Sequence, residues 1–174
     1  RYNNYKKNIV GIYRTMQDIL GFTDEERDRF MELEIETEKK MLVCRKEVVR
    51  AYQYALLQGK RVFLISNMHL PESIMRGILS GMGIEGYEKL LVSCDYQCGK
   101  TSGLFRIYQE MVPKGRCLHI GDDKIADGAA SDEGIDVFLI RSAVKLLKTS
   151  NLKTLTGYAH SMKEQNALGL FLSE

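Results

Sequence analysis

A serine, a lysine and a group of aspartates follow short apolar runs of this sequence, and together they could bind a phosphate group and a divalent cation. Ser66 ends the run RVFLIS, Lys100 lies soon after the run LLVSC, and Asp122 follows RCLHIG, with Asp127 about one helical turn further on. Hydroxyl and ammonium groups bind phosphate oxygens, whereas a hard cation such as Mg²⁺ binds carboxylates. The set fits phosphate chemistry, but it includes no nucleophile or base for the displacement.

The apolar runs predict the strands that position these residues. They cover residues 61–66, 90–94, 116–121 and 136–140. Helical signals separate them: Pro71 suits a first helical position, Thr101 or Ser102 opens GLFRIYQEMV, and residues 126–133 lead to Gly134. This alternation predicts βαβ units and a parallel sheet with helices on both faces, and the continuous apolar runs fit strands buried on both sides. Because ligands of such sheets bind at the carboxyl ends of the strands, we expect the polar residues to meet at one edge.

The first third of the chain reads as helical. Apolar residues at helical spacing predict a helix over residues 1–20 that stops at Gly21. Thr23 then begins a second helix, with Glu26 placed to complete a capping box. A third helix is expected over Lys46 to Gln58 and ends at Gly59.

Each candidate residue also has an ordinary structural interpretation. Ser66 could cap the helix after it, Lys100 could be a solvated surface lysine, and Asp122–Asp123 could cap the following helix. Two of the histidines have structural interpretations as well. His119 is expected to pack inside a strand, and His69 to be an exposed loop residue.

Composition limits the class of protein. The 174 residues are 44% hydrophobic and 28% charged, which fits one globular α/β domain with a small helical appendage. A net charge of +2 without a basic block gives no case for a nucleic acid partner. No apolar run approaches the roughly 20 residues of a membrane span, and we expect a cytoplasmic protein. Its cysteines form no CxxC pair and are expected to be reduced: Cys44, Cys94, Cys98 and Cys117.

The order of these features resembles the later motifs of the haloacid-dehalogenase-like (HAD-like) hydrolases. Ser66 matches the family's second motif, Lys100 in CGKTSGLF the third, and HIGDDKIAD the fourth. The resemblance runs from about residue 32 to 147. It is closest to a bacterial branch, often fused to glycosyltransferases, in which the corresponding stretches are near SDMYLP and HIGDN. Asn67 stands here in place of an aspartate of that branch, and Asp123 in place of an asparagine.

The resemblance implies a fold and a domain organisation. The fold would be a HAD-like Rossmannoid α/β structure, a three-layer parallel sheet with an N-terminal helical cap. Residues 1–45 would form the cap region, residues 46–150 the α/β core without its first strand, and residues 151–174 a C-terminal tail. The family's first motif, a strand that ends in Asp-x-Asp with the nucleophile first, should precede the cap, and no Asp-x-Asp occurs in this chain.

The resemblance also implies an activity and roles for particular residues. The reaction would be Mg²⁺-dependent phosphohydrolysis through an aspartyl-phosphate, on a small phosphorylated substrate such as a sugar phosphate. Ser66, Asn67 and Lys100 would bind the substrate, with Ser66 on the transferred phosphoryl group and Lys100 neutralising phosphate and nucleophile. Asp122 would hold Mg²⁺, and Asp127 would support the ion directly or through another ligand.

Without the first motif, this polypeptide alone should not form the phosphoaspartate. A sheet that lacks its central strand would leave unpaired edges that favour self-association. Fusion to or association with a glycosyltransferase is the partnership that the bacterial branch implies. The alternative is a non-catalytic HAD-like interaction or regulatory domain of a larger polysaccharide-biosynthesis protein.

Overall fold

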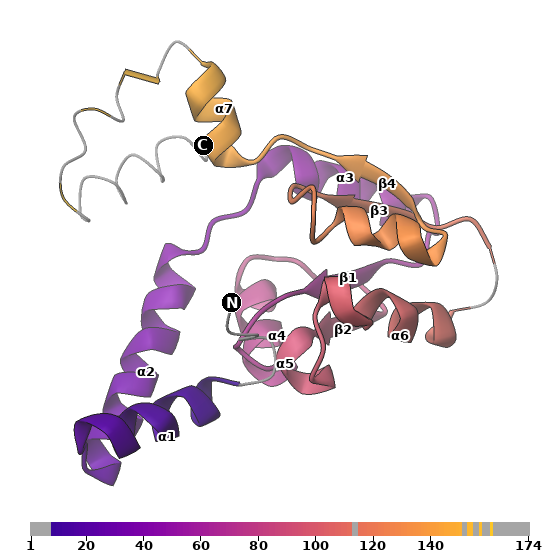
Figure 1. Cartoon of the computed structure of the whole chain (residues 1–174). Coiled ribbons are helices and arrows are strands. Elements are labelled where there is room, and N and C mark those ends of the chain that lie inside the picture. The colour runs from indigo at the N-terminus through magenta and orange to yellow at the C-terminus, as the bar shows by residue number, and fades with distance from the viewer. Residues whose placement is uncertain (1–7, 113–114, 151–152, 155–156, 158–160, 162–174) are drawn as a thin grey trace.

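The computed structural model describes residues 8–112, 115–150, 153, 154, 157 and 161 and has a mixed α/β fold (Figure 1). Most of the tail expected at residues 151–174, and the start of the first predicted helix, lie outside these residues. Helices α1 to α7 span Ile9–Leu20, Asp24–Met41, Lys46–Leu57, Glu72–Gly81, Ser93–Tyr96, Leu104–Met111 and Ala143–Thr149. Strands β1 to β4 span Phe63–Ser66, Lys89–Val92, Leu118–Gly121 and Asp136–Leu139, and 3₁₀ turns η2 and η3 span Lys100–Ser102 and Gly128–Glu133.

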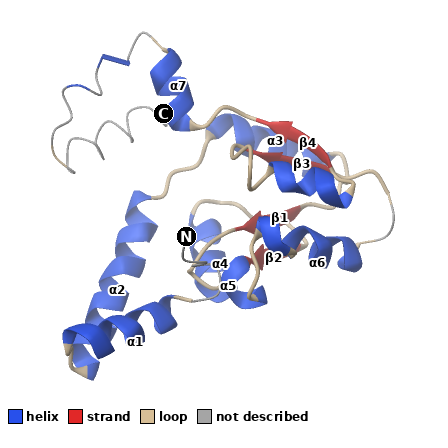
Figure 2. Ribbon diagram, viewed as in Figure 1, coloured by secondary structure: helices blue, strands red, loops and turns tan. Residues whose placement is uncertain are grey.

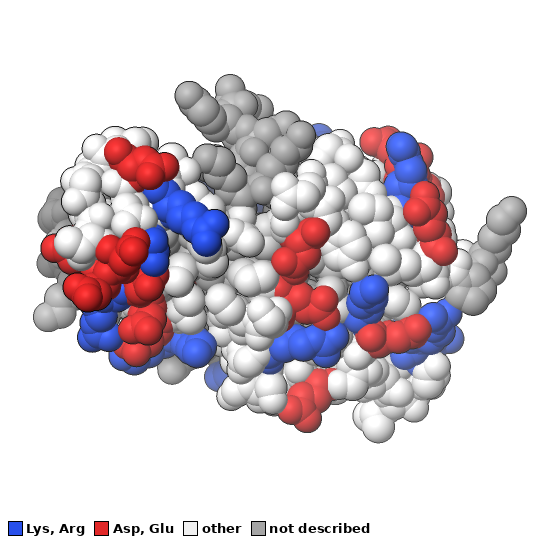
Figure 3. All heavy atoms as spheres, turned by 90° about the horizontal axis from the view of Figure 1, so that it is seen from below, with Lys and Arg blue, Asp and Glu red and all other residues white. Residues whose placement is uncertain are grey.

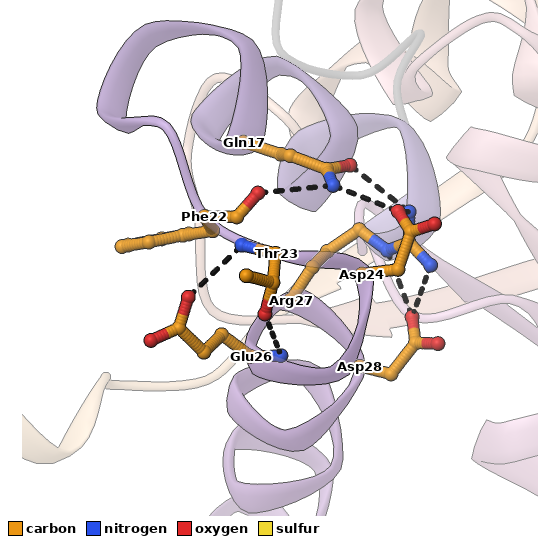
Figure 4. Close-up of polar contacts among 7 residues, drawn as sticks. All are labelled: Gln17, Phe22, Thr23, Asp24, Glu26, Arg27 and Asp28. Atoms are coloured by element: carbon orange, nitrogen blue, oxygen red, sulfur yellow. Dashed lines mark hydrogen bonds and ion pairs between the residues drawn. The ribbon is translucent and has the colours of Figure 1, made fainter.

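The predicted turn between the first two helices is confirmed. Gly21 ends α1 in the left-handed conformation, with φ of 72°, and donates its N–H to the carbonyl of Gln17 at 2.8 Å. The Thr23 hydroxyl accepts from the Glu26 N–H at 3.2 Å, and the Glu26 carboxylate accepts from the Thr23 N–H at 2.9 Å (Figure 4). This reciprocal capping box satisfies two backbone donors that a helix start leaves unpaired, so it fixes where α2 begins.

The four predicted strands are present and are shorter than expected. β2 ends at Val92, because Ser93 and Cys94 already belong to the short helix α5. Pro71 lies at the N-cap of α4 rather than at its first helical position. Both differences are shifts of one or two residues at element ends.

The strands pair in parallel, as predicted, but they form two separate two-stranded sheets (Figure 2). Phe63 of β1 is in register with Lys89 of β2, and Leu118 of β3 with Asp136 of β4. In the described part of the chain, β1 and β3 therefore each have one edge without a strand partner. A single sheet of all four strands is not observed.

Helix α6 joins the two sheets by apolar packing. Its Phe105, only 1% exposed, forms a buried cluster with Ala130 and Ile135 near β4. Ile65 of β1 and Val137 of β4 pack against the same cluster. Side chains from both strand pairs thus share one core, although no strand hydrogen bonds connect the pairs.

The prediction that the strands are buried on both faces holds for β2 alone. Leu90, Leu91 and Val92 of β2 are at most 1% exposed. In the second sheet, Ile120 of β3 lies opposite Phe138 of β4 on a face that is exposed. The alternation in β3 and β4 shows that only one face of this sheet packs against the described core.

The N-terminal helices pack on the core through α1. Ile9 and Tyr13 of α1 form a buried cluster with Leu70 and with Ile78 of α4. The Ile9 N–H also donates to the carbonyl of His69 at 2.9 Å. By contrast, α2 has no buried residue, although its Met31 and Ile35 pack against the edge of the same cluster.

We predict that replacing Thr23 with alanine lowers the free energy of unfolding by about 1 kcal/mol, because the Glu26 N–H loses its acceptor. Urea unfolding followed by circular dichroism measures the change. Thr37→Ala is the matched control: it removes the same atoms from the interior of α2, where alanine has the higher helix propensity. Equal losses for the two variants would show that the capping box does not stabilise α2.

Candidate functional site

Side-chain hydrogen bonds connect the loops after β1 and β2, and one of them binds the backbone of Lys100. Ser66 is the last residue of β1, and the next residue, Asn67, accepts the backbone N–H of Lys100 at 2.8 Å through its Oδ1. The Ser93 hydroxyl at the end of β2 accepts from the Met68 N–H at 3.0 Å. These bonds hold the start of η2 beside the carboxyl end of β1, as the sequence predicts for a parallel sheet.

The side chain of Lys100 extends from there to the loop after β3, where it contacts Asp127. The Nζ atom lies 2.5 Å from Oδ1 of Asp127, and the two side chains are 14% and 4% exposed. His119 Nε2 lies 2.8 Å from the same oxygen. Oδ2 accepts the N–H groups of Asp122 and Asp123, each at 2.9 Å. Both oxygens of this buried carboxylate are therefore occupied.

These contacts keep Asp127 ionised, whereas burial favours the neutral form of His119. Burial opposes ionisation of Asp127, but the hydrogen bonds from Lys100, His119 and the backbone outweigh it and hold its pKa well below its usual value. Burial lowers the pKa of His119, and the Asp127 contact only partly offsets that effect. The neutral imidazole then donates its Nε2–H to the carboxylate, and Lys100 supplies the one positive charge of the group.

Gly121 leaves the space that the Asp127 carboxylate occupies. A Cβ atom on Gly121 would lie 2.1 Å from Cγ of Asp127 and 2.3 Å from its Oδ2. The backbone of Gly121 is that of an ordinary strand, so the requirement for glycine is one of space. The Gly-Asp step of HIGDDKIAD thus has a physical reason: the strand end and the buried carboxylate approach too closely for any side chain.

Two other candidate side chains, those of Ser66 and Asp122, have no partner of this kind within the described residues. In the described residues, the Ser66 hydroxyl and the Asp122 carboxylate make no hydrogen bond or ion pair, and Asp122 is exposed. Asp123 instead accepts the N–H groups of Ile125 and Ala126, each at 2.7 Å, which is the capping role expected of this pair. Ser66 and Asp122 therefore remain available to a ligand, while Asp123 and Asp127 organise the loop.

Sequence reasoning missed several supporting residues. His119 was expected to be a packing residue; its ring does pack edge-on against Phe105, at 4.8 Å between centroids, but it also contacts Asp127. His69 was expected to be an exposed loop residue, yet its Nε2 lies 2.8 Å from Oε1 of Glu34. His119 lies on the core-facing side of β3, whereas the more apolar Leu118 and Ile120 are exposed, so alternation in the sequence does not identify this contact.

The side-chain oxygens around the Lys100–Asp127 pair would supply only part of a metal site. Carboxylate and hydroxyl oxygens are the ligands that Mg²⁺ prefers, and Asp122 and Ser66 supply them. The described residues contain no group of three or more His, Cys, Asp or Glu side chains that could hold a metal ion. A complete magnesium site would therefore need further oxygen ligands from water, substrate or another segment.

No protein-family model matches the sequence, and no curated protein matches it. In the part of the chain that the structure describes, no helix is both long enough and apolar enough to cross a membrane. All four cysteines are free thiols.

We predict that Gly121→Ala destabilises the protein by about 1–3 kcal/mol, because the added methyl group overlaps the Asp127 carboxylate. Gly128→Ala is the control, since a Cβ atom there has open space around it. Thermal unfolding of both variants checks the prediction. Equal stability of the two variants would mean that Asp127 does not occupy this position.

We also predict that Asp127 makes stability depend on pH in acid. The unfolded chain protonates this carboxyl near pH 4, about its ordinary value, whereas the folded protein keeps it ionised to lower pH. The stabilisation is thus fully present above about pH 5 and declines as the pH falls. At pH 7, Asp127→Asn should cost about 3–5 kcal/mol, because it leaves Lys100 buried without its charge partner.

The measurement is urea unfolding of both proteins between pH 3 and pH 7. The difference in unfolding free energy should shrink as the pH falls, whereas Asp136→Asn, at an exposed ion pair with Arg116, should have almost no effect. A difference that is constant over this range would contradict an ionised Asp127 in the folded protein.

Proposed function

We propose that this chain carries the phosphate-binding and metal-binding part of a HAD-like, Mg²⁺-dependent phosphohydrolase. The observation that carries the proposal is the Lys100–Asp127 ion pair, which brings the carboxyl ends of β1 and β3 to one point. Beside it lie the unoccupied Ser66 hydroxyl and Asp122 carboxylate. A free hydroxyl, a buried ammonium and a free carboxylate, in this order along the chain, are what the family's later motifs supply.

The free edges of β1 and β3 support the proposal that one more strand belongs between them. In the described residues each of the four strands has one unpaired edge, and β1 and β3 are the two strands that face the other sheet (Figure 2). Helix α6 packs against both sheets. A strand in parallel with both would convert the two pairs into one sheet, with α1 and α2 as its cap. Its carboxyl end would lie next to Ser66 and Lys100, where a carboxylate could act as the nucleophile.

Each residue then has a definite role. The Ser66 hydroxyl and the Asn67 segment bind the phosphoryl oxygens, and the ammonium of Lys100 neutralises their charge and that of the nucleophile. Asp122 is the candidate magnesium ligand, while Asp127 acts by orienting Lys100 and the Asp122 backbone. When bound, Mg²⁺ would neutralise charge that develops on the phosphoryl oxygens.

The substrate class rests on the resemblance alone. We propose a small phosphorylated metabolite, with sugar phosphates favoured by the branch's link to glycosyltransferases. A cytoplasmic location and fusion to or association with a glycosyltransferase belong to the same proposal. So does self-association through the unpaired strand edges.

A second candidate function is a non-catalytic interaction domain. The closed Lys100–Asp127 pair favours it, because Lys100 is only 14% exposed and is already neutralised without any substrate. Such a domain would keep the ion pair to stabilise the fold, and its partner would bind independently of Mg²⁺.

The test is hydrolysis of p-nitrophenyl phosphate, with and without Mg²⁺, by the longest polypeptide that the reading frame encodes. We expect Mg²⁺-dependent activity that falls by about 100-fold or more in Asp122→Asn and in Lys100→Met, as removal of transition-state contacts does. Asp136→Asn, which removes an exposed carboxylate at the first residue of β4, is the control.

Two outcomes would count against the enzyme. Absence of activity in a folded protein would favour the interaction domain. Activity that is equal in the Asp122→Asn variant and the control would exclude the proposed site.

A further inference from the structure

Helices α1 and α2 meet at an angle at one end of the molecule (Figure 1). Their side chains form a groove between them. Its volume of about 420 Å³ is within the range of small-molecule sites, which is roughly 300–1,000 Å³. None of the residues assigned to phosphate chemistry lines it. The lining side chains come from the two helices and the turn between them: Tyr13, Met16, Phe22, Phe30, Leu33, Glu34, Thr37 and Glu38.

Aromatic rings form much of the apolar wall. Phe22 and Phe30 have ring centroids 5.0 Å apart with an interplanar angle of 52°. Phe30 and Leu33 are 41% and 40% exposed, whereas Tyr13 is buried. The groove therefore presents apolar and aromatic surface to solvent on one side of α2.

Helix α2 as a whole is strongly acidic. The helix has eight carboxylates and four basic residues, a net charge of −4 in a chain whose net charge is +2. Figure 3, seen from below, shows acidic side chains gathered at the end of the molecule where these helices lie. Glu34 and Glu38 line the groove one helical turn apart, where like charges repel each other.

The two glutamates differ in how they are held. Glu34 accepts the Tyr13 hydroxyl at 2.7 Å on one oxygen and contacts His69 Nε2 at 2.8 Å on the other. Burial and the neighbouring Glu34 raise the pKa of Tyr13 to about 12, so the hydroxyl stays a donor. The carboxylate of Glu38 makes no hydrogen bond or ion pair within the described residues. One carboxylate of the groove is thus fixed in place, and the other is unoccupied.

We propose that this groove binds an organic ammonium ion with an apolar or aromatic body. The cation would lie between the carboxylates of Glu34 and Glu38 and relieve their repulsion, and the body would rest against Phe22, Phe30 and Leu33. Ammonium ions are attracted both to carboxylates and to aromatic faces, whereas a neutral ligand of the same shape gains only the apolar contact. This site is separate from the proposed phosphohydrolase chemistry and does not depend on it.

His69 links the groove to the loop after β1, because it contacts Glu34 from the core side. A cation that binds Glu34 changes the field at the imidazole of His69. The chain has three histidines, so the His69 ring signals can be assigned and followed by nuclear magnetic resonance. They give a readout that is independent of any enzyme activity.

The experiment is a titration of the ¹⁵N-labelled chain with benzylammonium, and in parallel with benzyl alcohol, its neutral counterpart. We expect saturable shifts of the Phe30, Glu38 and His69 signals with benzylammonium, and affinity at least about fivefold weaker for the alcohol. Glu38→Gln should weaken benzylammonium binding by about the same factor. Glu36→Gln removes the same charge from α2 outside the groove and should leave binding nearly unchanged.

Several outcomes would overturn the proposal. Equal affinity for the amine and the alcohol would show that the groove is only an apolar surface. Equal weakening by Glu38→Gln and Glu36→Gln would reduce the effect to the net charge of α2. If sedimentation shows that the free chain is a dimer and that benzylammonium dissociates it, the groove holds a second copy instead.

Discussion

The buried carboxylate of Asp127 is the group on which the rest of this structure depends. It lies where β3 ends, and it receives a lysine from the segment after β2, a histidine from within β3 and two backbone N–H groups from its own loop. A buried carboxylate is costly unless all of these donors are present, so the three segments must meet in one arrangement. The missing side chain of Gly121 is part of the same requirement, because no other residue leaves room for the carboxylate.

This polar centre explains how two unconnected strand pairs form one unit. The β1–β2 and β3–β4 pairs share no strand hydrogen bond. They are held together by α6, which packs against both pairs, and by the contact of Lys100 with Asp127. Apolar packing alone tolerates sliding, whereas a charged pair at 2.5 Å fixes the relative position of the carboxyl ends. The same pair leaves Ser66 and Asp122 at the edge of the polar centre, free to bind a ligand.

Much of this arrangement could be predicted from local patterns. The apolar runs located the four strands and their parallel pairing, and Thr23 with Glu26 located the start of α2. Contacts between distant residues were harder to predict, because the sequence does not say which buried polar groups meet. The contacts of His119 with Asp127 and of His69 with Glu34 are two that local patterns did not predict. The separation of the sheet into two pairs was anticipated only as the absence of a strand.

The central proposal is that a further strand lies between β1 and β3. Hydrogen exchange of their backbone amides, compared between this chain and the longest polypeptide of its reading frame, tests it most directly. The account predicts that amides of β1 pointing away from β2, and of β3 pointing away from β4, exchange rapidly in this chain and become protected in the longer protein. Rapid exchange of these amides in both forms would contradict it.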